Sequence, residues 1–194
     1  DAGRLTRGYL AACSYADAMV GRVLDALEDS GHAEDTVVVL WSDTGYHLGE
    51  KGAWAKHTLW ERTSNVPFLW AGPGVVEGQV SGATVSLLDT YPTLLSLCGL
   101  PANPDVEGVD LSPLLADPDS VADDRSVLQG DGDQFALISS RWRYIRTTGG
   151  EEQLYDLEAD PGEHENLAGN PEYASQLEGF AARLPTELAP AGMR

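Results

Sequence analysis

The stretch VVVLWSDTGYHLGEKGAWAKHTLW, residues Val37–Trp60, decides the fold that the sequence predicts. The run Thr36–Trp41 is rich in β-branched residues and does not alternate with polar residues, so it predicts a central strand covered on both faces. A polar, glycine-containing loop begins directly after it, at Ser42–Asp43. Open α/β sheets build their sites in loops at the carboxyl ends of buried strands, so this loop is the first place to look for function.

The segments on either side of this stretch predict an α/β layer. Apolar residues at three- and four-residue steps predict an amphipathic helix over about residues 5–30, ended by Gly31. Val66–Ala71 predicts a second buried strand, and Asp89–Leu97 predicts a helix with a proline in its first turn. We therefore predict an incomplete α/β sheet with flanking helices.

The character of the chain changes after about residue 100. Pro, Asp and Gly accumulate over residues 104–133, and apolar residues then alternate at short range. The elements predicted there are a hairpin, a further strand and a closing helix: Phe135–Ser139 with Trp142–Thr147, Gln153–Leu157 and Pro171–Leu184. We predict two domains, a portion of an α/β core over residues 1–125 and a small antiparallel subdomain with a terminal helix over residues 126–194.

Composition excludes several kinds of partner. The chain has 12 basic and 31 acidic residues, a net charge of −19, which repels nucleic acids and anionic membranes. The acidic residues fit either a solvated surface or cation-binding sites, and their dispersal favours the surface. No apolar run approaches the roughly 18 residues of a membrane span. Cys13 and Cys98 lie in apolar helical patterns and predict buried free thiols. The chain begins at Asp1 and not at Met, so we expect a piece of a longer protein and leave its localisation open.

The polar loop holds the candidate site residues. Asp43 stands where a carboxylate would face a crevice as a metal ligand or general base, although Ser-Asp-Thr-Gly is also good turn chemistry. His47 and Glu50 are further candidate ligands. The only two lysines of the chain, Lys51 and Lys56, lie in this loop, whereas the other ten basic residues are arginines. A lysine here suits a point-charge contact to an anion, and chance clustering of two surface lysines is the alternative.

The motifs of this region, taken together, resemble a known family. LWSDTGYHLGEKGAWAKHTLWERTSNVPFLWAGPG is similar to the signature of the formylglycine-dependent sulfatases of the alkaline phosphatase superfamily, in particular the iduronate-2-sulfatase-like branch. The resemblance continues in YLAACSYADAMVGRVLDALEDSG before it and VSLLDTYPTLLSLCGLP after it. LYDLEADPGEHENLAG resembles the family's C-terminal subdomain. The resemblance implies part of an alkaline-phosphatase-like sulfatase sheet, followed by a small C-terminal antiparallel sheet and helix.

The resemblance also implies roles for residues of the loop. Asp43 matches an aspartate that binds calcium, together with carboxylates from earlier in the family's chain. Thr44 stands where the family usually has a further metal ligand, His or Asn. Lys56 matches a lysine that contacts the sulfate of the substrate, and His57 adjoins it. His47 is expected to have a structural or specificity role, and Asp89 to help start the following helix.

One departure from the family pattern decides what this chain can do. The formylglycine nucleophile comes from C/S-x-P-x-R, and that pattern is absent from the 194 residues. We therefore expect the C-terminal part of a sulfatase that is inactive alone, belonging to a parent that hydrolyses sulfate esters by a calcium-assisted formylglycine mechanism. The expected partners are a sulfate-ester small molecule or sugar, the missing N-terminal part and, for the isolated chain, a second copy. The alternatives are a phosphonate monoester hydrolase or phosphodiesterase of the same superfamily, and a non-catalytic pseudo-sulfatase fragment.

Overall fold

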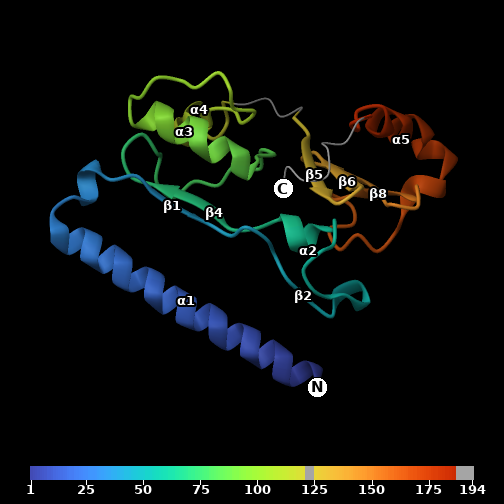
Figure 1. The fold of residues 1–194 in the computed structure, drawn as a ribbon, viewed down its shortest axis with the longest axis horizontal. Helices are drawn as coiled ribbons and strands as arrows, with labels where there is room; N and C mark the ends of the chain where they lie inside the picture. Colours follow the sequence, from blue (N-terminus) through green and yellow to red (C-terminus); the bar gives the residue numbers. More distant parts are fainter. Residues whose placement is uncertain (121–124, 187–194) are drawn as a thin grey trace. The chain divides into compact units, whose positions relative to one another are not determined.

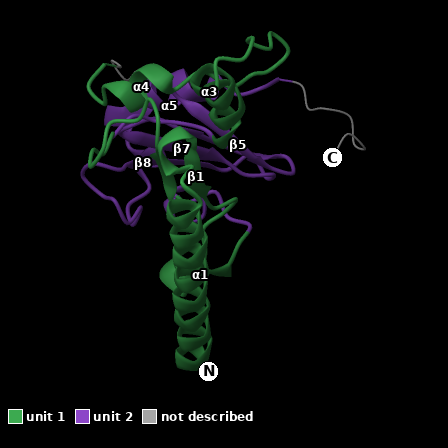
Figure 2. Ribbon diagram, turned by 90° about the vertical axis from the view of Figure 1, so that its left-hand side faces the viewer, with its two compact units in different colours: residues 1–56, 66–81, 87–121 green, residues 57–65, 82–86, 122–194 purple. Residues whose placement is uncertain are grey.

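A computed structural model describes residues 1–120 and 125–186, which form two compact units (Figures 1 and 2). Unit 1 contains residues 1–56, 66–81 and 87–121, and unit 2 contains residues 57–65, 82–86 and 122–194. The chain therefore enters unit 2 for the first time directly after Lys56. The predicted domain division at residues 125 and 126 stays a prediction. No helix in the described ranges is long and apolar enough to cross a membrane.

Unit 1 combines helices with two short antiparallel strand pairs. Its helices and strands are α1 (Ala2–Ser30), β1 (Val38–Trp41), β2 (His47–Leu48), β3 (Trp54–Ala55), β4 (Phe68–Ala71), α3 (Thr90–Leu97) and α4 (Ser112–Ala116). The predicted first helix is confirmed: the Asp1 side chain accepts the Gly3 amide hydrogen at 3.1 Å, and Gly31 ends the helix with a left-handed φ of 77°. Mixed helices and partial sheets in this unit agree with the predicted α/β class.

The environment predicted for the first strand is wrong. β1 pairs with β4 in a two-stranded antiparallel sheet, with Val38 opposite Ala71 and Trp41 opposite Phe68. The last two residues of the strand, Leu40 and Trp41, are 41% and 50% exposed. An apolar run predicts a strand whose side chains pack against other residues, but it does not show that those residues belong to the same chain.

The predicted burial of the two cysteines is also wrong. Cys13 and Cys98 are free thiols, as expected, but both are exposed. Helix α1, which carries Cys13, buries none of its residues although its sequence is amphipathic. The described residues therefore cover the apolar stripe of that helix only in part, for example where Tyr9 stacks on Tyr46.

Asp89 stands at the start of its helix, as the sequence predicts, but its side chain makes no capping hydrogen bond. It stands at the N-cap position of α3, but its carboxylate instead accepts the Val109 amide hydrogen at 2.9 Å. Thr93, one turn into the helix, donates to the Asp89 carbonyl at 2.6 Å and accepts the Leu111 amide hydrogen at 2.8 Å. Both side chains are fully buried, so they fasten the loop around residues 109–111 to α3.

Unit 2 is built on a four-stranded antiparallel sheet in the order β5-β6-β7-β8. Its helices and strands are α2 (Glu61–Ser64), β5 (Val127–Asp131), β6 (Gln134–Ile138), β7 (Trp142–Arg146), β8 (Glu152–Asp156) and α5 (Ala174–Ala181). The predicted hairpin is confirmed as β6 and β7, and the predicted third strand as β8. Strand β5 was not predicted, because it lies at the end of the Pro-, Asp- and Gly-rich stretch.

Both faces of this sheet are covered within unit 2. One apolar cluster combines side chains of β6, β7 and β8 with Phe180 and Leu184 from the closing helical segment. The other places Leu59 against Ala136, Ile145 and Tyr155. Residues of a strand alternate between the faces, so Tyr144 belongs to the first cluster and its neighbour Ile145 to the second. The segment that follows Lys56 thus covers the second face of the C-terminal sheet.

Candidate functional site

The candidate loop begins where β1 ends. The Ser42 amide extends the pairing of β1 with β4 by donating to the Pro67 carbonyl at 3.3 Å. The Ser42 hydroxyl then donates to the Thr44 carbonyl at 2.8 Å, and the Thr44 hydroxyl donates to the Gly45 carbonyl at 3.2 Å. These contacts turn the chain out of the strand, and Asp43, at the turn, is exposed.

A short hairpin then brings the loop back on itself. β2 pairs with β3, with His47 opposite Ala55 and Leu48 opposite Trp54. Gly49 has a φ of 115°, and a Cβ there would lie 3.2 Å from the Trp54 ring, so the tight return requires glycine. Asp43 precedes the first strand of this hairpin and Lys56 follows the second. Lys56 is thus the first residue after the hairpin, and Asp43 lies in the turn that leads into it.

His47 lies inside the hairpin and not at its surface. Its side chain is fully buried, and its Nδ1 atom is 4.0 Å from the Glu50 carboxylate. Glu50 in turn accepts the Leu48 amide hydrogen at 2.6 Å. Glu50 thus closes the turn of the hairpin, and the buried His47 side chain fills its interior.

Lys56 is exposed and stands between two residues with unusual backbone conformations. Ala55 has a φ of 69° and His57 a φ of 67°, in the left-handed region that residues other than glycine rarely adopt. The His57 side chain is 84% exposed, and its Nδ1 atom is 3.9 Å from the Asp131 carboxylate. Strained backbone of this kind is most common at functional sites, where the surrounding structure maintains it.

The described residues do not by themselves form a calcium site. They contain no group of three or more His, Cys, Asp or Glu side chains that could hold a metal ion. Asp43 and Thr44 together offer a carboxylate and a hydroxyl, whereas calcium takes 6–8 oxygen ligands. A resident calcium ion would need ligands from elsewhere.

The sequence matches the sulfatase family over residues 2–100, which is more than half of the chain. The chain belongs to the sulfatase family. A curated relative described as a sulfatase, from Formosa agariphila, is 40% identical over 182 residues, which is 94% of this chain and 36% of the relative. The predicted family resemblance is thereby confirmed. The chain spans about a third of the length of the curated relatives it matches.

Solved structures support the same assignment. One of them, in complex with its substrate D-glucosamine-2-N,6-O-disulfate, has a TM-score of 0.71 and 26% identity, and covers 86% of this chain and 36% of that chain. Another, the phosphonate monoester hydrolase of Agrobacterium radiobacter, has a TM-score of 0.73 and 25% identity, and covers 87% of this chain and 38% of that chain. The predicted alkaline-phosphatase-like fold class, with partial sheets, flanking helices and a small antiparallel sheet, is confirmed for this sulfatase chain.

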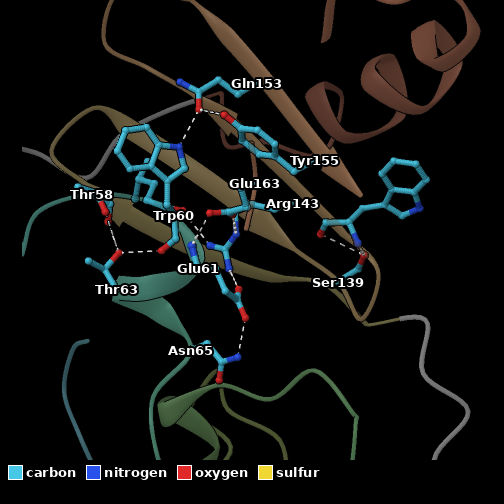
Figure 3. A network of polar contacts seen from close by, with 12 residues as sticks. Thr58, Trp60, Glu61, Thr63, Asn65, Ser139, Arg143, Gln153, Tyr155 and Glu163 are labelled. Carbon is cyan, nitrogen blue, oxygen red and sulfur yellow. Dashed lines mark hydrogen bonds and ion pairs between the residues drawn. The ribbon is translucent and has the colours of Figure 1, made fainter. Parts of the chain in front are cut away.

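Sequence reasoning missed a buried ionic cluster in unit 2 of this sulfatase chain, shown in Figure 3. The Arg143 side chain in β7 is 1% exposed, and its Nε atom lies 2.7 Å from the Glu163 carboxylate, which is 2% exposed. Arg143 also pairs with Glu61 and donates to the Leu59 carbonyl at 2.8 Å. A lone arginine in an alternating strand gave no signal of this, because its partners are distant in sequence.

Proposed function

We propose that this chain works as the C-terminal part of a sulfate-ester hydrolase and that Lys56 binds the sulfate group of the substrate. The observation that carries the proposal is the position of Lys56, which is exposed, lies inside the stretch that matches the sulfatase family, and stands between two left-handed residues. Against a net charge of −19, an anionic substrate needs a local positive charge, and this loop holds both lysines of the chain.

The chemistry assigned to the chain is electrostatic. An ammonium group beside the sulfate offsets the negative charge that builds on its oxygens as the ester bond breaks. His57, next in sequence and largely exposed, is proposed to contact the substrate from the same dipeptide and to hold or pass a proton there. These two residues are the catalytic part of the proposal. The substrate is proposed to be a sulfated sugar or another small sulfate ester, supported by the structural relative that was solved with a disulfated glucosamine.

The metal and the nucleophile belong to the complete enzyme. Sulfatases are in general metal-dependent. Asp43 and Thr44 are proposed as two of the ligands of a calcium ion whose remaining ligands come from an N-terminal part, which would also supply the formylglycine. The span of the chain, about a third of its relatives, supports this division of labour.

A second candidate function has a specific observation in its favour. The structural relative described as a phosphonate monoester hydrolase matches this chain about as well as the sugar sulfatase does. A lysine that contacts a sulfate would also contact a phosphonate, because both present tetrahedral oxygens with negative charge. A non-catalytic pseudo-sulfatase would instead keep the fold and turn over neither ester.

The test uses the enzyme that joins this chain to its N-terminal part. It compares the hydrolysis of several esters and the activities of two lysine variants. Release of inorganic sulfate from a panel of sugar, choline and aryl sulfates is measured beside hydrolysis of a phosphonate monoester. The Lys56→Ala variant is expected to lower kcat/KM for the best sulfate ester by about 100-fold or more, a typical loss when a charge-stabilising donor is removed. Lys51→Ala is the matched control and is expected to retain activity. Phosphonate hydrolysis without sulfate release would favour the alternative, and equal activity of both lysine variants would refute the role of Lys56.

A further inference from the structure

The strongest unassigned feature of the molecule is the cluster of buried charges around Arg143. This arginine lies in β7, on the sheet face that carries Ile145, and its guanidinium is out of contact with solvent. Buried charges are costly unless opposite charges lie beside them, and each charge of this cluster has an opposite charge within ion-pair distance. Here the guanidinium faces the carboxylates of Glu61 and Glu163 and the Leu59 carbonyl.

The cluster also binds the backbone of the segment Leu59–Glu61, in addition to the Glu61 side chain. While one oxygen of Glu163 pairs with Arg143, the other accepts the Glu61 amide hydrogen at 3.0 Å. Glu61 uses its second oxygen to accept a hydrogen bond from Asn65 at 2.5 Å. Two buried side chains of unit 2 thus hold both a carbonyl and an amide of the stretch Leu59–Glu61.

Neighbouring contacts hold the same segment in the same place. The Trp60 indole donates to the Gln153 side-chain carbonyl at 3.0 Å, and the Tyr155 hydroxyl donates to that same oxygen at 2.9 Å (Figure 3). Thr63 donates to the Thr58 carbonyl at 2.7 Å, which closes the turn before α2. Every residue from Thr58 to Glu61 is therefore tied either to the sheet or to this turn.

This segment follows directly on the proposed sulfate contact. Lys56 precedes Leu59 by three positions, and the hairpin that ends at Ala55 fixes the chain on its other side. Only the dipeptide Lys56–His57 separates the two anchored stretches, and both Ala55 and His57 are in the left-handed region. His57 belongs to the same unit as the anchored stretch and directly precedes it, and strain of this kind persists only where the surroundings impose it.

We propose that Arg143 is a positioning residue of the sulfatase site: with Glu61 and Glu163 it fixes the backbone of Leu59–Glu61, and thereby holds His57, and the peptide bond that joins it to Lys56, in the orientation that sulfate binding requires. The inference rests on the proposed function, since it concerns the placement of the same lysine. Arg143 itself touches neither the substrate nor the reacting atoms. A lysine in its place would keep the charge but lose the planar fork that reaches three acceptors at once.

The first experiment tests, without any substrate, whether Arg143 fixes the segment Leu59–Glu61. Hydrogen exchange at the Glu61 amide is measured in this chain and in its Arg143→Lys variant, with amides of β6 and β7 as an internal reference. We expect exchange at Glu61 to accelerate by about tenfold or more while the reference amides stay protected, because local opening of the segment then needs less free energy. Arg141→Lys is the matched control, since that arginine is half exposed and pairs with Asp156 and Glu158 instead. Unchanged exchange at Glu61 in Arg143→Lys would overturn the proposal.

The second experiment tests the consequence for the site in the enzyme joined to its N-terminal part. Arg143→Lys is expected to lower kcat/KM for the best sulfate ester by about tenfold to 100-fold and to weaken inhibition by inorganic sulfate, because a displacement of about 1 Å costs that much at a reacting centre. Activities are compared per folded enzyme, well below each unfolding temperature, so that a merely structural role leaves kcat/KM unchanged. Accelerated exchange with full kcat/KM per folded enzyme overturns the positioning role. Full activity of Lys56→Ala would instead refute the proposed function, independently of the exchange result.

Discussion

Removing the buried cation should destabilise unit 2 more than removing either of its anionic partners. The cluster holds one positive and two negative side chains, so Arg143→Met leaves two carboxylates facing each other with no cation. Breaking a buried pair in this way costs about 3–5 kcal/mol. Glu163→Gln leaves Arg143 balanced by Glu61 and should cost less. Glu61→Gln should cost least, because that side chain is 27% exposed and its charge is partly screened by water.

Urea unfolding of the chain, followed by tryptophan fluorescence, measures these differences. With an m-value of about 2 kcal/mol/M, a loss of about 4 kcal/mol shifts the midpoint of unfolding by about 2 M. The decisive comparison is a variant with Arg143→Met, Glu61→Gln and Glu163→Gln combined. It should recover most of the lost stability, since it leaves no charge buried without a partner. The reasoning is refuted if the combined variant is as unstable as Arg143→Met, or if Arg143→Met shifts the midpoint no more than Arg141→Met.

Four further outcomes are expected. The chain alone should release no sulfate from aryl sulfates above the level of its Lys56→Ala variant, because its sequence lacks the nucleophile motif, and clear turnover by the pure chain would contradict this. The chain should self-associate in sedimentation experiments, because β1, β4 and α1 expose large apolar side chains, and a compact stable monomer would count against it. The Arg141 guanidinium lowers the pKa of Asp156 in the folded chain, so this pair should stabilise the fold above the unfolded pKa of about 3.9, and the contribution should vanish as pH falls through the folded pKa. Acid unfolding monitored by circular dichroism should show this loss, and Asp156→Asn should reduce it. In the enzyme joined to its N-terminal part, calorimetry should detect tight calcium binding that Asp43→Ala abolishes, and equal binding by that variant would remove Asp43 from the proposed ligands.

Local patterns of the sequence predicted most of the elements. The three- and four-residue steps before Gly31 predicted α1, and short-range alternation predicted β6, β7 and β8. These signals are local, since they depend on which side of one helix or strand faces an apolar environment. What covers an element is not local. The apolar run of β1 therefore predicted the strand correctly and its surroundings incorrectly.

Polar side chains with distant partners lay beyond such reasoning. Asp89 was expected only to help start its helix, but its carboxylate also accepts a hydrogen bond from an amide 20 positions later. Nothing in the local sequence distinguishes Arg143 from an exposed arginine, because its partner Glu61 lies 82 positions away. A sequence pattern gives the spacing of apolar residues within one helix or strand. These contacts depend instead on which distant loops pack against that helix or strand in the fold. Contacts between polar residues distant in sequence were for this reason the hardest to predict.

The apolar contacts of the segment Leu59–Glu61 hold it on the sheet, whereas the charged contacts around Arg143 fix its position there. Leu59 packs against Ala136, Ile145 and Tyr155, and the burial of this apolar surface holds the segment on the sheet. Apolar attraction has no direction, so on its own it would tolerate a small slide of the segment along the face. The Arg143 guanidinium donates hydrogen bonds in fixed directions to the Glu61 carboxylate and the Leu59 carbonyl, and these bonds do not tolerate that slide. The sulfate contact proposed for Lys56 depends on direction in the same way, because an ammonium group acts only where it can reach the sulfate oxygens. A directional anchor next to a directional contact is therefore the arrangement that this function requires, and an apolar anchor alone would not provide it.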